Sequence, residues 1–129
     1  MYIHHLAVWT QDLERLRSFY QTYFEAKAGD KYTNPAKRYE SYFLTFESGA
    51  KLELMCRPDI TERQTGPETQ FTGYTHLSIA TGSEQQVDRL TVRLQKDGYP
   101  LVDGPRRTGD GYYESLVLDP DGNRVEITV

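Results

Sequence analysis

Residues 5–8 read HLAV, and a near copy, HLSI, stands at residues 76–79, 71 positions further along the chain. A second pair of stretches follows in the same order, LEL at residues 52–54 and VEI at residues 125–127, 73 positions apart. Self-similarity that keeps its order along a chain indicates one structural unit that occurs twice. The two extra positions fit into the second of two predicted hairpin turns, which is the longer one.

The first unit is predicted to contain a strand, a helix and then further strands. Residues 3–9 alternate between two faces, which is typical of a strand. Apolar side chains recur at helical spacing over residues 13–24, directly after Asp12, a residue type favoured at helix N-caps. Residues 39–46 and 51–57 are rich in β-forming side chains, so they are expected to pair as a hairpin.

The second unit repeats this order. Residues 74–80 alternate as a strand does. Residues 83–86 read SEQQ, a capping box, and open a predicted helix that Gly98 is well placed to end. A closing hairpin is expected from residues 113–118 and 124–129.

The whole chain is interpreted as one domain, with units at about 1–57 and about 74–129. A linker of about residues 58–73, rich in Thr, Glu, Gly and Pro, joins them. Residues 103–111 hold four glycines or prolines and two arginines. That segment is too long for a tight turn, so it is predicted to be a lid.

Composition excludes several classes of protein. At 129 residues and 14.9 kDa the chain can bury a core without disulfides. A net charge of -4 and a pI of about 5.3 argue against a nucleic-acid partner. The single cysteine, Cys56, rules out an internal disulfide and a multi-cysteine zinc site. No apolar run approaches the ~18 residues of a membrane span and no secretory leader is visible, so a cytoplasmic protein is expected.

A histidine and a glutamate occupy equivalent places in both units. Strand alternation puts His5 and Glu53 on the sheet face that does not pack on the predicted helix, and the same holds for His76 and Glu126. Any one of these residues alone is more often structural than a ligand. The repetition of the pair indicates a metal site, because the four side chains would converge if the units are related by a pseudo-two-fold axis.

Two imidazoles and two carboxylates suit one divalent ion of zinc, nickel, cobalt, iron or manganese. Four protein ligands would leave open positions on a six-coordinate ion for water or substrate. His4 provides an internal comparison. It is predicted to point to the face opposite His5, and Thr75 stands at its place in the second unit, so it is interpreted as structural.

These features resemble those of the vicinal oxygen chelate superfamily, also called the glyoxalase/bleomycin-resistance/dioxygenase superfamily. The resemblance spans essentially all 129 residues. It is carried by IHHLAV at residues 3–8, the helix with Phe19 and Tyr20, GYTHLSI at residues 73–79, and the most specific stretch, DPDGNRVEI at residues 119–127.

The resemblance implies an α+β fold of tandem βαβββ units that form an open, barrel-like mixed sheet around a metal cleft. It also implies that the metal ligands are His5, Glu53, His76 and Glu126. Within the superfamily, extradiol dioxygenases and fosfomycin-modifying members lack the first carboxylate, and methylmalonyl-CoA epimerases typically carry Gln there. Glu53 therefore resembles the glyoxalase I pattern.

The resemblance further implies a lyase or isomerase that acts on a small vicinally oxygenated substrate through an enediolate. Glu126, or Glu53 by pseudo-symmetry, would then move the substrate proton. Bacterial glyoxalase I enzymes place an Arg and an Asn for glutathione where this chain holds Trp9 and Arg57. That difference argues against glutathione as part of the substrate.

The expected partners are a small-molecule substrate and a second copy of the chain, with no nucleic acid and no membrane. Relatives are usually dimers, and sequence leaves open whether the metal ligands come from one chain or two. The alternative function is a non-catalytic, antibiotic-type binding protein of the same fold, which ten tyrosines and one tryptophan would suit. Residues expected to contact the substrate are Trp9, Phe43, Thr45, Met55, Tyr113, Ser115 and Arg106, the last on the predicted lid.

Overall fold

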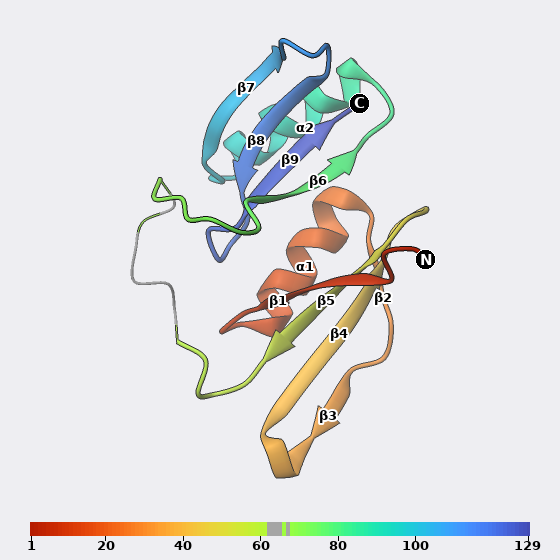
Figure 1. The fold of residues 1–129 in the computed structure, drawn as a ribbon, viewed down its shortest axis with the longest axis vertical. Coiled ribbons are helices and arrows are strands. Elements are labelled where there is room, and N and C mark those ends of the chain that lie inside the picture. The colour runs from red at the N-terminus through yellow and green to blue at the C-terminus, as the bar shows by residue number, and fades with distance from the viewer. Residues whose placement is uncertain (62–65, 67) are drawn as a thin grey trace. The chain divides into compact units, whose positions relative to one another are not determined.

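The computed structural model describes residues 1–61, 66 and 68–129. The chain divides into two compact units, Met1–Gln64 and Thr65–Val129, and each contains one mixed sheet and one long helix (Figure 1). Both sheets are open, and the fold is α+β. The predicted linker of about residues 58–73 lies partly outside the described residues.

The sheet of the first unit has the order β1-β5-β4-β2, with β3 also paired to β4. Strand β1 runs parallel to β5, and the other pairs are antiparallel. The sequence did not predict β2, β3 or the short 3-10 helix η1. The elements are β1 (His5–Trp9), α1 (Leu13–Phe24), β2 (Lys27–Ala28), β3 (Tyr32–Asn34), η1 (Pro35–Lys37), β4 (Tyr39–Thr45) and β5 (Lys51–Cys56).

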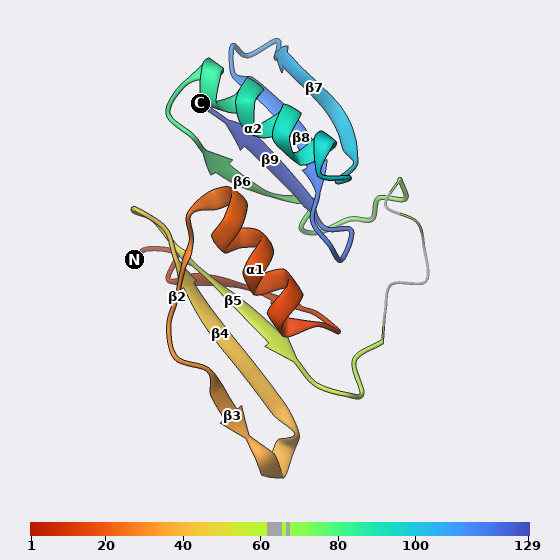
Figure 2. The same cartoon turned by 180° about the vertical axis from the view of Figure 1, so that it is seen from behind.

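Helix α1 begins where the sequence predicts. The side chain of Asp12 accepts a hydrogen bond from the backbone N–H of Arg15 at 3.0 Å, which satisfies one of the free donors at the helix start. The apolar stripe of α1 packs on one face of its sheet (Figure 2). The core between them is formed by Leu13, Leu16, Phe19, Tyr20, Phe24, Leu44, Leu52 and Leu54, all buried.

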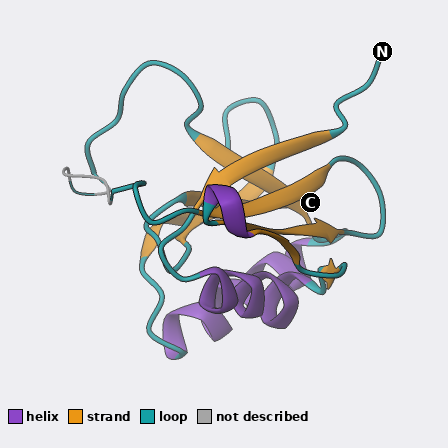
Figure 3. Ribbon diagram, turned by 90° about the horizontal axis from the view of Figure 1, so that it is seen from below, coloured by secondary structure: helices purple, strands orange, loops and turns teal. Residues whose placement is uncertain are grey.

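The second unit repeats the topology in a simpler form. Its sheet has the order β6-β9-β8-β7, with β6 parallel to β9 and the other pairs antiparallel. In both units the helix forms a layer of its own against the strands (Figure 3). The elements are β6 (His76–Ala80), α2 (Glu84–Lys96), β7 (Leu101–Arg107), β8 (Tyr113–Leu118) and β9 (Arg124–Thr128).

Helix α2 also keeps its predicted ends. Ser83 is the N-cap and its hydroxyl accepts from the N–H of Gln86 at 3.3 Å. Gly98 follows the helix with φ +94°, a left-handed conformation that favours glycine. The face of α2 that carries Val87, Thr91 and Leu94 is buried against the sheet.

The predicted lid is largely a strand. Residues 103–107 belong to β7, which pairs with β8, and only residues 108–112 form the connecting loop. Strand β7 has two register shifts, and the one between Asp103 and Arg106 spans the Gly-Pro pair. It also lies at a sheet edge, where a proline is tolerated. Gly104 has φ +81°, and a Cβ there would lie 2.5 Å from the carbonyl oxygen of Glu114. The strand therefore needs a glycine at this position.

Within the described residues, no helix is both long enough and apolar enough to cross a membrane.

Candidate functional site

The register of the parallel strands places the histidine and the glutamate in the same way in both units. In the first, Ala7 of β1 lies opposite Glu53 of β5, and His5 stands two residues before Ala7 on the same face. In the second, Ser78 of β6 lies opposite Glu126 of β9. His76 again stands two residues earlier. The sequence repeat therefore encodes a repeated side-chain arrangement.

The two pairs have nearly the same geometry. Nε2 of His5 lies 3.6 Å from Oε2 of Glu53, and Nε2 of His76 lies 3.5 Å from Oε2 of Glu126. The side chains of the histidines are 38% and 36% exposed and those of the glutamates 14% and 18%, so each carboxylate is the more deeply set partner. Each unit thus presents one nitrogen and one oxygen, side by side and open to a ligand.

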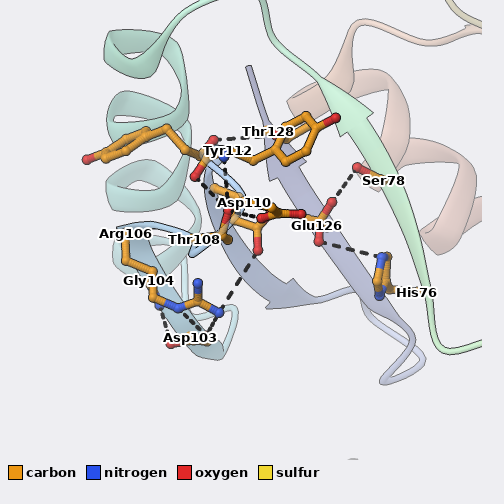
Figure 4. Close-up of polar contacts among 12 residues, drawn as sticks. His76, Ser78, Asp103, Gly104, Arg106, Thr108, Asp110, Tyr112, Glu126 and Thr128 are labelled. Atoms are coloured by element: carbon orange, nitrogen blue, oxygen red, sulfur yellow. Dashed lines mark hydrogen bonds and ion pairs between the residues drawn. The ribbon is translucent and has the colours of Figure 1, made fainter.

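In each pair, the second carboxylate oxygen is held by a hydroxyl. The Tyr39 hydroxyl donates to Oε1 of Glu53 at 3.0 Å, and the Ser78 hydroxyl donates to Oε1 of Glu126 at 2.6 Å. Figure 4 shows the contacts of Glu126 with both His76 and Ser78. Burial raises the pKa of Tyr39, and its hydrogen bond to Glu53 raises that pKa further, so the phenol stays a donor at neutral pH. Both glutamates therefore keep Oε2 turned toward the histidine.

The donor atoms of each pair fit one divalent ion. Bonds of about 2.0–2.2 Å to nitrogen and oxygen ligands place neighbouring ligand atoms roughly 3.0–3.6 Å apart, and both His–Glu separations fall at the upper end of that range. Hydroxyls that orient a ligating carboxylate are a usual part of such sites. Among the described residues, no group of three or more His, Cys, Asp or Glu side chains is close enough to hold a metal. Within each unit, the described residues thus bring together one histidine and one glutamate.

His4 does not point away from His5 as the strand pattern predicts. It precedes the first residue of β1, and its Nδ1 lies 2.8 Å from Nδ1 of His5. Because Nδ1 of His5 is used in this contact, Nε2 is the ring nitrogen that lies toward Glu53. The prediction was wrong because alternation holds only inside the strand.

The first unit brings three predicted substrate contacts to the Glu53 face. Phe43 lies opposite Glu53 on β4, and its ring meets that of His5 at 5.4 Å between centroids. Trp9 lies beside Met55 in the register of β1 and β5. The Trp9 ring meets the ring of Tyr39 edge-on at 6.2 Å. Tyr39 is not among the residues predicted to line the site, although its alternation with Phe43 on β4 places the two on one face.

The structure corrects the predicted positions of Tyr113 and Ser115. The expectation that they share the face of Glu126 is wrong, because both lie on the helix side of β8. The Tyr113 hydroxyl donates to Asp88 of α2 at 2.8 Å, and Ser115 is buried with its hydroxyl 2.6 Å from that of Thr91. A shift of one residue reverses every side chain of a strand, and the mixed pattern of β8 does not fix its phase.

The face of β8 that does meet Glu126 carries Glu114, which the sequence pattern did not predict as part of the site. Burial, followed by the neighbouring Glu126 carboxylate, raises the pKa of Glu114. A cavity of about 400 Å³ lies over this face and is rich in hydroxyl groups. It is lined by Ser78, Thr108, Asp110, Tyr112, Glu114, Glu126 and Thr128, most of which are drawn in Figure 4.

The two arginines of the predicted lid lie on opposite faces of β7. The Arg106 guanidinium is 2.6 Å from Asp103 and 4.0 Å from Glu114, on the side of Glu126 (Figure 4). Arg107 instead pairs with Glu84 of α2 and covers the Tyr113 ring. Arg106 is therefore the one of the two that faces the candidate site, and it already has an acidic partner.

The turn before Glu126 is braced by a buried carboxylate. Asp119 is 3% exposed, and its Oδ1 accepts from the N–H of Asn123 at 2.8 Å while its Oδ2 accepts from the Asn123 side chain at 2.9 Å. Gly122 takes φ +77° in the same turn. These contacts fix the path of the chain into β9, and hence the position of Glu126.

Comparison with known proteins places the fold and the family. The chain is 24% identical to glyoxalase I from Zea mays, with a TM-score of 0.80 over 98% of this chain and 44% of that one, so it spans less than half of that enzyme. It is also 24% identical to the trypanothione-dependent glyoxalase I of Leishmania major, with a TM-score of 0.76 over 98% of this chain and 84% of that one. At these identities the likeness shows the fold.

A relative in Bacillus subtilis, the uncharacterized protein YqjT, is 27% identical over 97% of this chain and 96% of its own length. A second, YwkD, is 28% identical over 97% of this chain and 94% of its own length. The sequence model of the glyoxalase/bleomycin resistance protein/dioxygenase superfamily matches residues 2–127, nearly the whole chain. This protein therefore belongs to the glyoxalase/bleomycin resistance protein/dioxygenase superfamily.

Proposed function

We propose that the protein is a divalent-metal-dependent lyase or isomerase that acts on a small vicinally oxygenated substrate. The supporting observation is the repeated pair, in which a histidine Nε2 lies 3.5–3.6 Å from a glutamate Oε2 while a hydroxyl holds the other carboxylate oxygen. His5, Glu53, His76 and Glu126 would bind one ion of zinc, nickel, cobalt, iron or manganese. Such an ion supplies Lewis acidity to the oxygens of a chelating substrate.

The glutamates have a second role in this proposal. A carboxylate next to an acidified carbon is a suitable base. Oε2 of Glu126 would give up its place as a ligand, take the substrate proton and return it at the neighbouring carbon. Ser78 keeps Oε1 engaged, so the proton is carried by the oxygen that faces His76. Glu53 can play the same part, with Tyr39 in place of Ser78.

Each His–Glu pair would have walls from its own unit. Trp9, Phe43 and Met55 provide an apolar and aromatic surface beside Glu53. The cavity beside Glu126 is lined by four hydroxyl and three carboxyl side chains, which suit a substrate with hydroxyl groups. Arg106 would meet a substrate carboxylate on this side if it released Asp103.

Metal content tests the proposal directly. Protein purified without chelators should hold about one divalent ion per set of two histidines and two glutamates. Glu53→Gln should lower the metal content at least tenfold, whereas Glu47→Gln, on an exposed residue outside the sheets, should leave it unchanged. Full metal content in a His5→Ala, His76→Ala double variant would refute the site.

The substrate is proposed not to contain glutathione. Trp9 and Arg57, which stand where relatives are expected to contact glutathione, are engaged with each other, because the Arg57 guanidinium lies 5.5 Å from the centre of the Trp9 ring. The metal-loaded protein should therefore turn over the glutathione–methylglyoxal hemithioacetal with kcat/KM below about 10⁵ M⁻¹s⁻¹. A higher value would show that these two positions do not exclude glutathione.

A cluster of aromatic rings supports the alternative function, a non-catalytic binding protein. The rings of Trp9, Tyr39 and Tyr32 form a series with centroid separations of 6.2 and 6.1 Å, and Phe43 meets His5 on the same sheet. Such a surface suits a flat ligand held by stacking. Saturable binding of metal-free bleomycin by protein stripped of metal, with no metal uptake, would favour this function over the enzyme.

A further inference from the structure

A cavity of about 550 Å³ in the first unit is rich in positive charge. It lies where η1 leads into β4 and where β5 ends, and it is lined by Lys37, Arg38, Arg57, Pro58 and Asp59, a set named here the basic basin. Three cationic side chains thus surround one carboxylate, in a chain whose net charge is -4. Such a concentration of positive charge attracts anions.

The Arg57 guanidinium is held in place by two neighbours. It lies over the Trp9 ring at 5.5 Å, and its Nε donates to Oδ1 of Asp59 at 2.5 Å. The hydrogen bond from Arg57 lowers the pKa of Asp59, and the charge of Arg38 contributes to the same shift. The basin therefore already favours the charged form of a carboxylate, although this one is exposed to water.

The other two cations remain available for a ligand. Among the residues that the structure describes, neither Lys37 nor Arg38 forms a side-chain ion pair or hydrogen bond. Arg38 ends η1 in the left-handed conformation, with φ 49° and ψ 40°, and its N–H donates to the carbonyl of Pro35 at 3.2 Å. A non-glycine residue in this conformation is uncommon and is often found at functional sites.

The basin is connected to the candidate metal ligand by two aromatic rings. Trp9 contacts Arg57 on one side and meets Tyr39 on the other, and the Tyr39 hydroxyl donates to Glu53. Arg57 follows Glu53 by four residues, roughly 13 Å along an extended chain. A substrate that reaches Glu53 with its oxygens can therefore extend over Trp9 into the basin.

We propose that the basic basin binds an oxyanion, a carboxylate or a phosphate, that the substrate carries at the end remote from its reacting oxygens. The identification of that anion as part of the substrate rests on the function proposed above. The binding of the anion itself requires only the residues of the first unit.

Trp9 is the one tryptophan of the chain and its ring lies against the Arg57 guanidinium, so its fluorescence can report on binding in the basin. Metal-free protein would be titrated with inorganic phosphate and, separately, with succinate, with potassium chloride holding the ionic strength constant. A saturable change in fluorescence is expected with at least one of them. The anion that binds more tightly identifies the remote group of the substrate as a phosphate or a carboxylate.

Two lysine variants give a matched comparison. Lys37→Gln should weaken anion binding about tenfold, because a charged donor is lost, whereas Lys27→Gln, on the exposed strand β2, should have no effect. Asp59→Asn should tighten binding, since it removes the competing carboxylate. No saturable change with either anion, or equal weakening in the two lysine variants, would overturn the proposal.

Metal analysis of the same samples separates this proposal from the previous one. Lys37→Gln protein that retains its metal but loses the anion supports the basin as a distinct subsite. Wild-type protein that binds phosphate or succinate but no metal would overturn the metal-dependent function and leave the anion site standing.

Discussion

Ser78 donates its hydroxyl to Oε1 of Glu126 at 2.6 Å, and the first unit has Ala7 at the corresponding place. There, the hydroxyl comes from Tyr39 on a different strand, which donates to Glu53 at 3.0 Å. The two units thus reach the same arrangement of the carboxylate with different residues. Because both units hold Oε1 of the glutamate with a hydroxyl, the orientation of the carboxylate is the feature that the two units share.

Removal of either hydroxyl should weaken metal binding. Tyr39→Phe and Ser78→Ala are each expected to lower the affinity for Zn²⁺ about 10–100-fold, the usual effect of losing a group that orients a metal ligand. Competition with a chromophoric chelator measures this affinity. Tyr42→Phe is the matched control, because the Tyr42 hydroxyl donates to Glu14 of α1 on the other face of β4. Ser18→Ala, on the exposed side of α1, is the control for Ser78→Ala.

The stability of the metal-free protein should depend on pH through Glu114. Burial and the nearby Glu126 raise the pKa of Glu114, so the folded state binds its proton more tightly than the unfolded state does. Stability from this source is full at pH values below the unfolded pKa of about 4.3 and is lost as the pH rises through the folded pKa. Glu114→Gln should therefore stabilise the protein at pH 7, by about 0.2–1 kcal/mol, the range of cross-strand pairs.

Urea unfolding at pH 7 and pH 4 checks this prediction. The extra stability of the Glu114→Gln variant over wild type should be present at pH 7. It should shrink toward pH 4, where wild-type Glu114 is increasingly protonated. Glu47→Gln, at an exposed position, should show no such difference. A Glu114→Gln variant that is less stable than wild type at pH 7 would contradict the argument.

A buried hydrogen bond in the second unit has a definite direction. The Thr91 hydroxyl donates to the carbonyl of Val87 at 2.7 Å, so the Ser115 hydroxyl, 2.6 Å away, must be the donor to Thr91. Thr91→Val would leave the Ser115 hydroxyl buried without its acceptor and should cost about 1–3 kcal/mol. Adding Ser115→Ala to that variant should recover much of the loss.

Denaturant unfolding of the two single variants and the double variant measures the coupling. The double variant is expected to be more stable than Thr91→Val alone, because neither partner is then left unsatisfied. Strictly additive losses would mean that the two hydroxyls do not depend on each other.

The protein is expected to be a dimer in solution. Strands β1 and β6 each lie at an edge of their sheet, and large apolar side chains near them are exposed, including Ile3 at 76% and Tyr74 at 96%. Exposed edges and apolar side chains together favour an interface. Light scattering at micromolar concentration should give a mass of about 30 kDa, twice that of the chain. A single species of 14.9 kDa would contradict this prediction.

Local sequence determined the repeat and most of the elements. Asp12 and Ser83 cap the helices that they were predicted to cap, because an N-cap acts on backbone groups two or three residues away. The alternation of β1 and β5 placed His5 and Glu53 on one face, and the register of the parallel strands then set them 3.6 Å apart. The caps and the alternation depend on short-range geometry, which can be recognised in a single sequence, whereas the pairing of β1 with β5 joins strands that are distant along the chain.

Tertiary structure alone decided the phase of β8 and the nature of residues 103–107. Glu114 and Leu116 alternate with Tyr113 and Ser115, and both faces of β8 mix polar with apolar side chains, so only packing against α2 selects the buried set. Gly104 and its proline predicted a loop, but pairing with β8 and two register shifts formed a strand. The hydroxyl of Tyr39 on β4 reaches Glu53 on the neighbouring strand β5, a contact that no local pattern specifies. Long-range pairing fixed these features because it involves partners that are distant in sequence.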